Sequence, residues 1–221
     1  MTREQVHAYH FTGAVLRDGR AIPAIGEWLE HAGQLELCES GLHASERLLD
    51  ALLYAPGLTL HVVTLDGDVQ CGSDKLAAQR RRIESSREVP FRAVVRLAIE
   101  SACLAAWCAG MYLPELITAL EACDREDWEA AARAARSAST AAWSAKPRAV
   151  AGAAGGAAGA AGASGSAWAA GAAVWAADAA DRAADAAWSA GAAWSAAGAA
   201  ARAATRAALE ARAQELCEVS L

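Results

Sequence analysis

The residue types best suited to chemistry gather in one short stretch, LELCESGLHAS, which runs from Leu35 to Ser45. It holds a thiol at Cys38, an imidazole at His43 and a hydroxyl at Ser45. A cysteine thiolate with a histidine nearby can act as a nucleophile, and His10 is a second candidate partner for Cys38. The same pattern is also typical of a structural junction with a buried Cys, a His bonded to a backbone carbonyl and a capping Ser.

The acidic neighbours of Cys38 argue against the nucleophile. Glu36 and Glu39 flank the thiol and disfavour its thiolate, whereas a reactive thiolate needs a positive setting. The run Arg80-Arg81-Arg82 is the one concentrated basic spot, typical of a solvated helix face but also suited to a phosphate contact. We assign no catalytic residue and take five residues as candidates for ligand binding: His10, Cys38, His43, Ser45 and Arg80.

The patterns around this stretch place its polar residues at a junction. Alternating apolar and polar residues predict a short strand at 34–37, and Ser40-Gly41 predicts a turn. Leucines at helical spacing then predict a helix over 45–55 with Ser45 as its N-cap. Loops between such elements commonly hold binding groups.

Residues 1–90 as a whole predict a small mixed α/β module. Strands are expected over 5–12 and 58–65, the second being rich in β-branched residues. Residues 75–86, KLAAQRRRIESS, are expected to form a helix capped by Asp74. Strands mixed with helices over this length are typical of an α+β domain.

The order of several motifs in this module resembles an uncharacterised domain found in actinobacterial and phage proteins. The resemblance covers residues 5–90 and rests on AYHFTGAV, on the C-x-x-G-x-H-A core at 38–44, and on later elements at 67–69 and at Lys75. Proteins with that domain often have Ala-rich C-terminal tails, as this chain does. The resemblance implies a fold unit and no established activity.

A second resemblance concerns the ADP-ribosyltransferase core. AYHFT, GLHAS and LHVVTLDGDV occur in an order similar to that core. The resemblance implies that His10 contacts a nicotinamide ribose and that Ser45 or His43 orients the nicotinamide. The glutamate that stabilises the oxocarbenium-like centre has no convincing match, although Glu84 and Glu88 are available.

After Pro90 the pattern changes to consecutive helices. Apolar spacing predicts helices over 91–108 and 114–123, and Asp124 is expected to cap a third over 125–145. Short connections predict an antiparallel bundle. Pro147 divides this part into a bundle segment at 91–146 and an Ala/Gly/Trp-rich region at 147–221.

Residues 149–208 are of low complexity. Gly every three or four residues weakens a helix, but a smooth Gly and Ala face would let another helix approach closely. Packed polyproline-II strands or a solenoid are the alternatives to helices for this region, and for residues 150–166 disorder is a further alternative. We expect helices, and we expect exposed Trp side chains to favour a homo-oligomer.

Composition argues against several classes of protein. The 221-residue chain has a formal net charge of −6, which argues against binding nucleic acid or an anionic membrane. Residues 147–177 carry only the charge of Arg148, but Ala and Gly are too weakly apolar for a membrane span. The six cysteines form no C-x-x-C pair, so we expect free thiols in the cytoplasm, with no metal and no cofactor.

The sequence thus predicts an α+β protein, with a mixed α/β module followed by an Ala-rich helical bundle. Its expected function is that of a non-enzymatic binding or accessory protein of phage or bacterial origin, active in host interaction or counter-defence. The N-terminal module would bind a ligand such as a nucleotide, or a protein partner. The absence of G-x-S-x-G, H-E-x-x-H and P-loop patterns favours this function. The alternative is an NAD-dependent enzyme similar to the ADP-ribosyltransferases.

Overall fold

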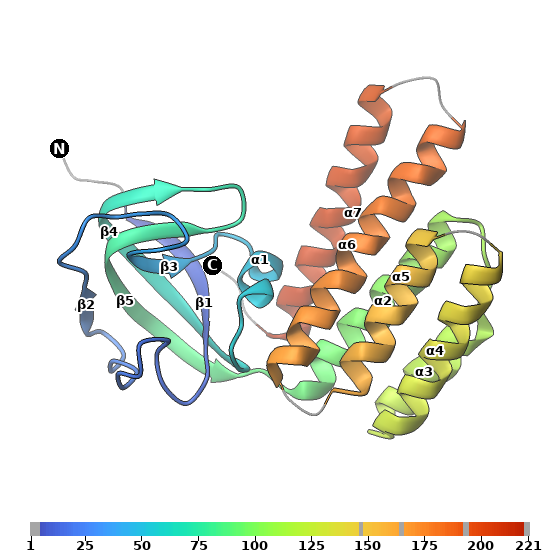
Figure 1. Ribbon diagram of the computed structural model, residues 1–221, viewed down its shortest axis with the longest axis horizontal. Coiled ribbons are helices and arrows are strands. Elements are labelled where there is room, and N and C mark those ends of the chain that lie inside the picture. The colour runs from blue at the N-terminus through green and yellow to red at the C-terminus, as the bar shows by residue number, and fades with distance from the viewer. Residues whose placement is uncertain (1–4, 146–147, 164–165, 192–194, 219–221) are drawn as a thin grey trace. The chain divides into compact units, whose positions relative to one another are not determined.

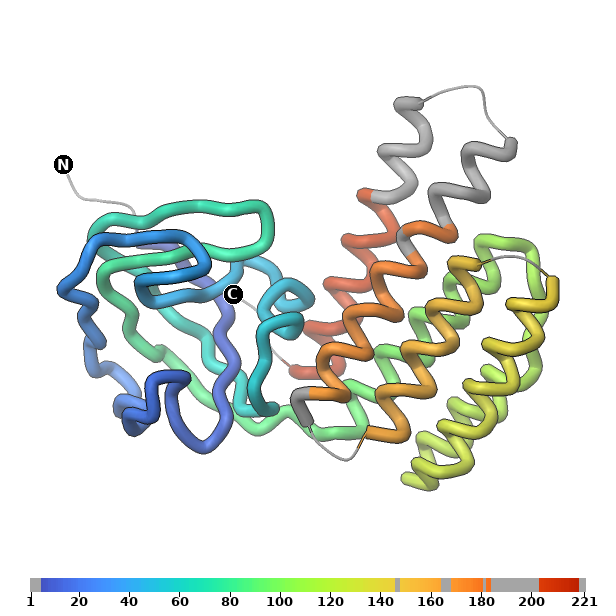
Figure 2. The backbone as a smooth tube through the Cα atoms, in the orientation of Figure 1, coloured from blue at the N-terminus to red at the C-terminus, as the bar shows by residue number. Residues whose placement is uncertain are grey.

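The computed structural model describes residues 5–145, 148–163, 166–191 and 195–218, and it confirms the expected α+β class (Figure 1). The chain divides into two compact units, with the boundary between Val89 and Pro90. The N-terminal unit contains an antiparallel sheet and a short helix, whereas the C-terminal unit is built from helices (Figure 2). Pro90 suits this boundary, since it cannot donate a hydrogen bond to a sheet and it immediately precedes a helix.

The described part of the N-terminal unit has five strands in one sheet. They are β1 (Val6–Thr12), β2 (Trp28–Glu30), β3 (Leu42–Ala44), β4 (Thr59–Cys71) and β5 (Leu76–Glu88). The sheet runs in the order β1-β4-β5-β2, β3 also pairs with β5, and these pairings are antiparallel. Strands β1 and β4 confirm the strands expected at 5–12 and 58–65.

Strand β5 occupies the segment where a helix was expected at 75–86, so that prediction is wrong. Residues such as Ala77, Gln79 and Arg81 have high helix propensities, which led to the expectation of a helix. In the structure β5 pairs with β4 along one edge and with β2 and β3 along the other. Pairing with three strands overrides the local preference, and Asp74 lies in the turn that precedes β5.

The sheet closes on itself through a backbone bridge between Tyr9 in β1 and Ser45, the residue after β3. Tyr9 N donates to Ser45 O over 2.7 Å, and Ser45 N donates to Tyr9 O over 2.9 Å. The pairings therefore run from β1 to β4, to β5, to β3 and back to β1, as in a small barrel. The bridge holds the short strand β3 beside the end of β1.

Two local predictions around Cys38 are wrong. Residues 34–37 form no strand, because the backbone turns between Glu36 and Ser40, with Cys38 near the tip at a φ of 78°. Helix α1 is shorter than expected, Leu48–Leu53, and its N-cap is Arg47. Ser45 does not cap this helix, since it lies in the bridge to Tyr9.

Apolar side chains from four strands fill the interior of the N-terminal unit. The buried cluster consists of Ala8, Ala44, Val63, Leu65, Leu76, Ala78 and Ile83, with Val6, Ile22 and Val69 packed against it. The cluster draws on β1, β3, β4 and β5, so the strands of the closed circuit share one core. That shared core keeps the positions of their polar side chains defined.

The C-terminal unit contains the expected helical bundle. Its described helices are α2 (Phe91–Cys108), α3 (Pro114–Asp124), α4 (Trp128–Ser144), α5 (Arg148–Ala161), α6 (Ser166–Gly191) and α7 (Ser195–Leu216). Helices α2 and α3 confirm the expected ranges. Asp127, rather than Asp124, caps α4, because its carboxylate accepts from Ala130 N over 3.0 Å. Asp124 instead pairs with Arg96 of α2.

The Gly-rich stretch forms helix α5, so residues 150–161 are helical and do not form polyproline-II strands; residues 164–165 lie outside the described residues. The expected close approach of a second helix is confirmed. A Cβ atom at Gly156 would lie 2.9 Å from Ala172 O and 3.0 Å from Ala176 N, both in α6. Gly156 therefore allows the backbones of α5 and α6 to touch.

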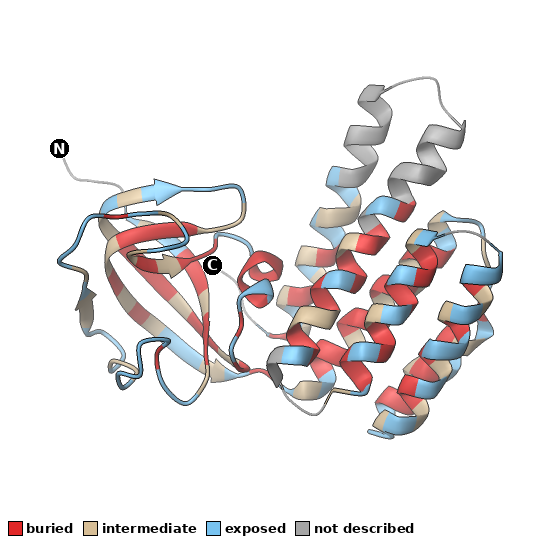
Figure 3. Ribbon diagram, viewed as in Figure 1, coloured by how far each residue is buried: buried red, intermediate tan, exposed pale blue. Residues whose placement is uncertain are grey.

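Each of these helices has buried positions along its described part (Figure 3), and small side chains dominate them. Larger apolar side chains remain at the surface: Trp107, Trp143, Trp168 and Trp175 are between 65% and 80% exposed. Among the described residues, no helix is both long and apolar enough to cross a bilayer.

Candidate functional site

A cavity of about 790 Å³ opens in the N-terminal unit. Its wall is formed by the end of β1, the loop at residues 13–20, the segment at 38–45, part of α1, and two cationic residues, Lys75 and Arg81. Four of the five candidate residues line it, namely His10, Cys38, His43 and Ser45. The bridge between β1 and Ser45 brings these separate stretches together.

Arg80, the fifth candidate, does not line the cavity. Side chains alternate along a strand, so β5 directs Arg80 and Arg82 to one face and Arg81 to the other. The guanidiniums of Arg80 and Arg82 lie 4.5 Å and 4.8 Å from the centroid of the Trp28 ring. Arg80 also pairs with Asp66 at 3.0 Å. The basic run therefore contributes Arg81, and not Arg80, to the cavity.

Arg81 is the buried cation of the cavity. Arg81 is 5% exposed, and its Nη1 donates to the backbone oxygen of His43 over 2.6 Å. Asp18 lines the same cavity but pairs with Arg20 at 2.6 Å, and Arg81 has no carboxylate partner among the described residues. Burial, together with the charge of Arg20, lowers the pKa of Arg81 to about 10. The guanidinium is therefore charged at neutral pH but largely removed from water.

The two histidines of the cavity are held in the neutral form. Burial, followed by the charge of Arg81, keeps the pKa of His10 well below its ordinary value. Burial, followed by the charge of Lys75, lowers the pKa of His43. The Nε2 atom of His43 is buried and has no hydrogen-bond partner among the described residues. A neutral imidazole can donate one hydrogen bond and accept another, so both rings are suited to contact a ligand.

His61 of β4 packs against His10. Their rings stack with centroids 6.2 Å apart. His61 Nε2 lies 2.8 Å from Thr12 Oγ1, and its Nδ1 lies 2.5 Å from Ser86 Oγ. Burial, together with the charge of Arg81, lowers the pKa of His61 to about 4. The sequence alone does not identify His61 as part of the site, because only the register of β1 against β4 sets it opposite His10.

Cys38 lies at the rim of the cavity beside a cation. Its side chain is exposed at the turn, and the ammonium group of Lys75 contacts it. Lys75 also lies 4.0 Å from the centroid of the Tyr54 ring, and the Tyr54 hydroxyl donates to Asp74. The surroundings of Cys38 therefore include a positive charge as well as the acidic neighbours seen in the sequence.

The lining is positively charged although the chain as a whole is acidic. Four cationic side chains line the cavity: Arg17, Arg20, Lys75 and Arg81. They face two carboxylates, Asp18 and Glu39, which leaves an excess of two positive charges. Cations gathered in a cleft with low-dielectric walls attract anions strongly. Buried apolar side chains, among them Phe11, Leu16 and Leu42, complete the wall.

The described residues contain no group of three or more His, Cys, Asp or Glu side chains arranged to hold a metal ion. Among the described residues, the cysteines at 38, 71, 103, 108, 123 and 217 form no disulfide bond. The arrangement at the cavity is best suited to holding an anionic molecule by charge and hydrogen bonds.

Residues 6–96 match the model of a family described as a domain of unknown function (DUF7666). This span contains the whole sheet, the cavity and the start of α2. It is consistent with the expected resemblance to an uncharacterised domain. No curated protein and no solved structure matches the chain.

Proposed function

We propose that the N-terminal unit binds a small anionic ligand, with nucleotides as the leading class, and that the protein is a non-enzymatic binding or accessory protein. The main support is the excess of positive charge around a cavity of about 790 Å³, in a chain with a net charge of −6. A cavity of this volume is typical of sites for ligands of nucleotide size.

The composition of the wall supports a ligand with two different ends. Cationic side chains such as Arg81 suit phosphate oxygens, whereas Phe11 and Leu42 suit the apolar face of a base. The neutral rings of His10 and His43 add directional hydrogen bonds.

A thermal-shift screen tests this proposal. The purified protein is heated with NAD, ADP-ribose and cyclic nucleotides, and the screen is repeated with His10→Ala and His43→Ala. A ligand at a hundredfold excess over its Kd stabilises the folded state by about 2.7 kcal/mol, which shifts the midpoint by several degrees. His7→Ala is the matched control, because His7 is exposed on β1 and lies outside the lining. A flat response across the panel would reject nucleotide binding.

An activity similar to that of the ADP-ribosyltransferases is the alternative proposal. Its support is that His10, His43 and Ser45 line one cavity. Glu84 accepts a hydrogen bond from Thr64 and does not line that cavity. Glu39 is therefore the one glutamate among the described residues of the lining. Release of nicotinamide from NAD, measured with wild type and Glu39→Gln, tests the alternative; no release by the wild type rejects it.

We further propose that the protein self-associates through its exposed tryptophans and acts in the cytoplasm. Trp143 and Trp168 are 65% and 80% exposed, which is costly for side chains of this size in a monomer. The free cysteines suit a reducing compartment. Light scattering at several concentrations tests the self-association, and a monomeric mass throughout would contradict it. An accessory role in a phage or its host is proposed from the resemblance to phage and actinobacterial proteins.

A further inference from the structure

We infer that Arg81 and His43 together form the seat for an oxyanion of the ligand, namely the phosphate of a nucleotide. The inference deepens the proposed function and rests on it. Two named side chains of the cavity wall then contact the phosphate of the nucleotide rather than its base.

The Arg81 side chain has hydrogen-bond donors to spare. A guanidinium has five N–H donors, and one nitrogen of Arg81, Nη1, donates to His43 O at 2.6 Å. The Arg81 side chain makes no other hydrogen bond and no ion pair among the described residues. The planar fork of the guanidinium therefore still has donors for two oxygen atoms of one ligand group, a geometry that phosphate matches.

The charge of Arg81 is buried without a carboxylate partner among the described residues. A buried cation is costly unless a counter-charge and hydrogen bonds accompany it. Both carboxylates of the lining are poorly placed for this role: Asp18 is paired with Arg20, and Glu39 is exposed at the turn around Cys38. An anionic ligand would supply the missing counter-charge, which makes Arg81 a strong anchor for it.

His43 provides the second contact of the seat. Its backbone oxygen accepts from Arg81, so the imidazole and the guanidinium belong to one local cluster. Its Nε2 is buried, has no partner among the described residues, and belongs to a residue that lines the cavity. A ring with a proton on Nε2 would donate to the same phosphate, adding a neutral hydrogen bond to the charged ones.

Calorimetry with the full chain tests the seat by comparing ADP with adenosine, which has the same base and no phosphate. We expect Arg81→Met to weaken ADP binding about 10- to 100-fold, the usual effect of losing hydrogen bonds to a charged group. Arg81→Lys should retain part of the affinity, since it keeps the charge but loses the fork. Arg80→Lys is the matched control, because Arg80 lies on the opposite face of the same strand; it should bind ADP as the wild type does.

A second measurement on the wild type guards against misfolding of the variants. Inorganic pyrophosphate is titrated into protein with ¹⁵N-labelled arginine, and the Arg81 side-chain signal, identified by its loss in Arg81→Lys, is followed. A saturable shift supports the seat. If adenosine binds as tightly as ADP, or if ADP binds and the Arg81 signal does not move, the seat is overturned while the cavity remains a binding site. If pyrophosphate moves the signal and no nucleotide binds, the seat stands and the nucleotide class is rejected. No response to any probe overturns both proposals.

Discussion

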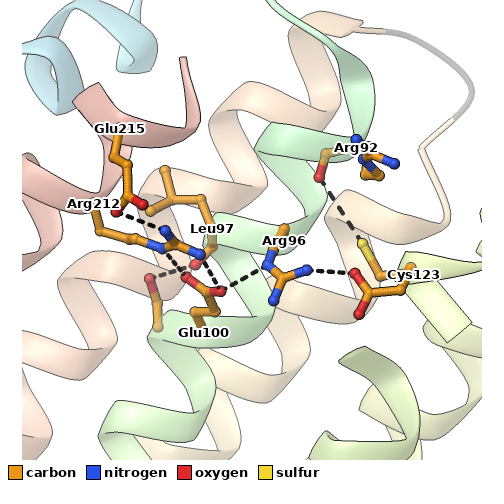
Figure 4. Close-up of polar contacts among 9 residues, drawn as sticks. Arg92, Arg96, Leu97, Glu100, Cys123, Arg212 and Glu215 are labelled. Carbon is orange, nitrogen blue, oxygen red and sulfur yellow. Dashed lines mark hydrogen bonds and ion pairs between the residues drawn. The ribbon is translucent and has the colours of Figure 1, made fainter. Parts of the chain in front are cut away.

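Glu100 in α2 and Arg212 in α7 are joined by two hydrogen bonds although they lie 112 residues apart (Figure 4). Arg212 Nε donates to Oε2 over 2.6 Å, and its Nη2 donates to Oε1 over 2.8 Å. Arg96, one helical turn before Glu100, donates to Oε1 over 2.8 Å. Burial opposes ionisation, but hydrogen bonds from Arg212 and Arg96 hold the pKa of Glu100 below its ordinary value. The shared carboxylate ties α7 to α2.

Glu100→Gln is expected to destabilise the C-terminal unit by about 1 to 2 kcal/mol, because both guanidiniums lose a charged acceptor. Chemical denaturation followed by circular dichroism measures the change. Glu129→Gln is the control. Glu129 forms an ion pair with Arg133 in which both side chains are exposed, so the pair should contribute less than about 0.5 kcal/mol to stability. Equal effects of the two substitutions would show that the Glu100–Arg212 interaction contributes no more to stability than an exposed ion pair does.

Gly156→Ala is expected to destabilise the bundle, because the added Cβ would meet backbone atoms of α6 at 2.9 Å and 3.0 Å. The helices would have to separate, and overpacking of this kind costs about 1 to 3 kcal/mol. Gly171→Ala is the matched control within α6, where a Cβ would meet nothing within 4 Å. It should stabilise the helix by up to about 1 kcal/mol, through helix propensity alone. A lower melting temperature for Gly156→Ala with a higher one for Gly171→Ala would confirm the contact between α5 and α6. Changes of the same sign in both variants would contradict it.

The N-terminal unit is expected to lose stability as the pH falls from about 6.5 to about 4, the window set by His61. The folded state lowers the pKa of His61, so the unfolded state binds the proton first and acid favours unfolding. For a shift of this size the loss is on the order of 3 kcal/mol. Urea midpoints measured across this window test it. His61→Gln should flatten the dependence, whereas an unchanged slope would assign it to other groups.

Cys38→Gly is expected to keep or raise stability, by up to about 1 kcal/mol, because Cys38 has a φ of 78° that glycine adopts without strain. Cys71→Gly serves as the comparison, since Cys71 is also exposed but lies in strand β4. Glycine in a strand should destabilise it by about 0.5 to 1 kcal/mol. Thermal melts of the two variants are measured under reducing conditions. If both substitutions lower the melting temperature, the backbone at Cys38 is not strained.

Local patterns in the sequence determined much of the architecture. Apolar residues at helical spacing and a proline at the first helical position are enough to define α2 and α3 within a residue. β-Branched residues between turn signals are enough to define the start of β4. These elements depend on interactions between near neighbours, which a sequence displays directly. Three of the cavity residues, Cys38, His43 and Ser45, were also identifiable, because unusual residue types cluster in this stretch, and His10 was identified as a second partner for Cys38.

Only the tertiary structure decided which side chains form the site. The segment with Arg80 and Arg81 favours a helix by local propensity, and it becomes a strand because three other strands pair with it. That change moves Arg80 to the outer face and Arg81 into the cavity, since side chains alternate along a strand. His61 joins His10 only through the register of β1 and β4. The physical reason is that sheets are held by contacts between residues distant in sequence, so neither their pairing nor the resulting burial of charge can be predicted from any one segment.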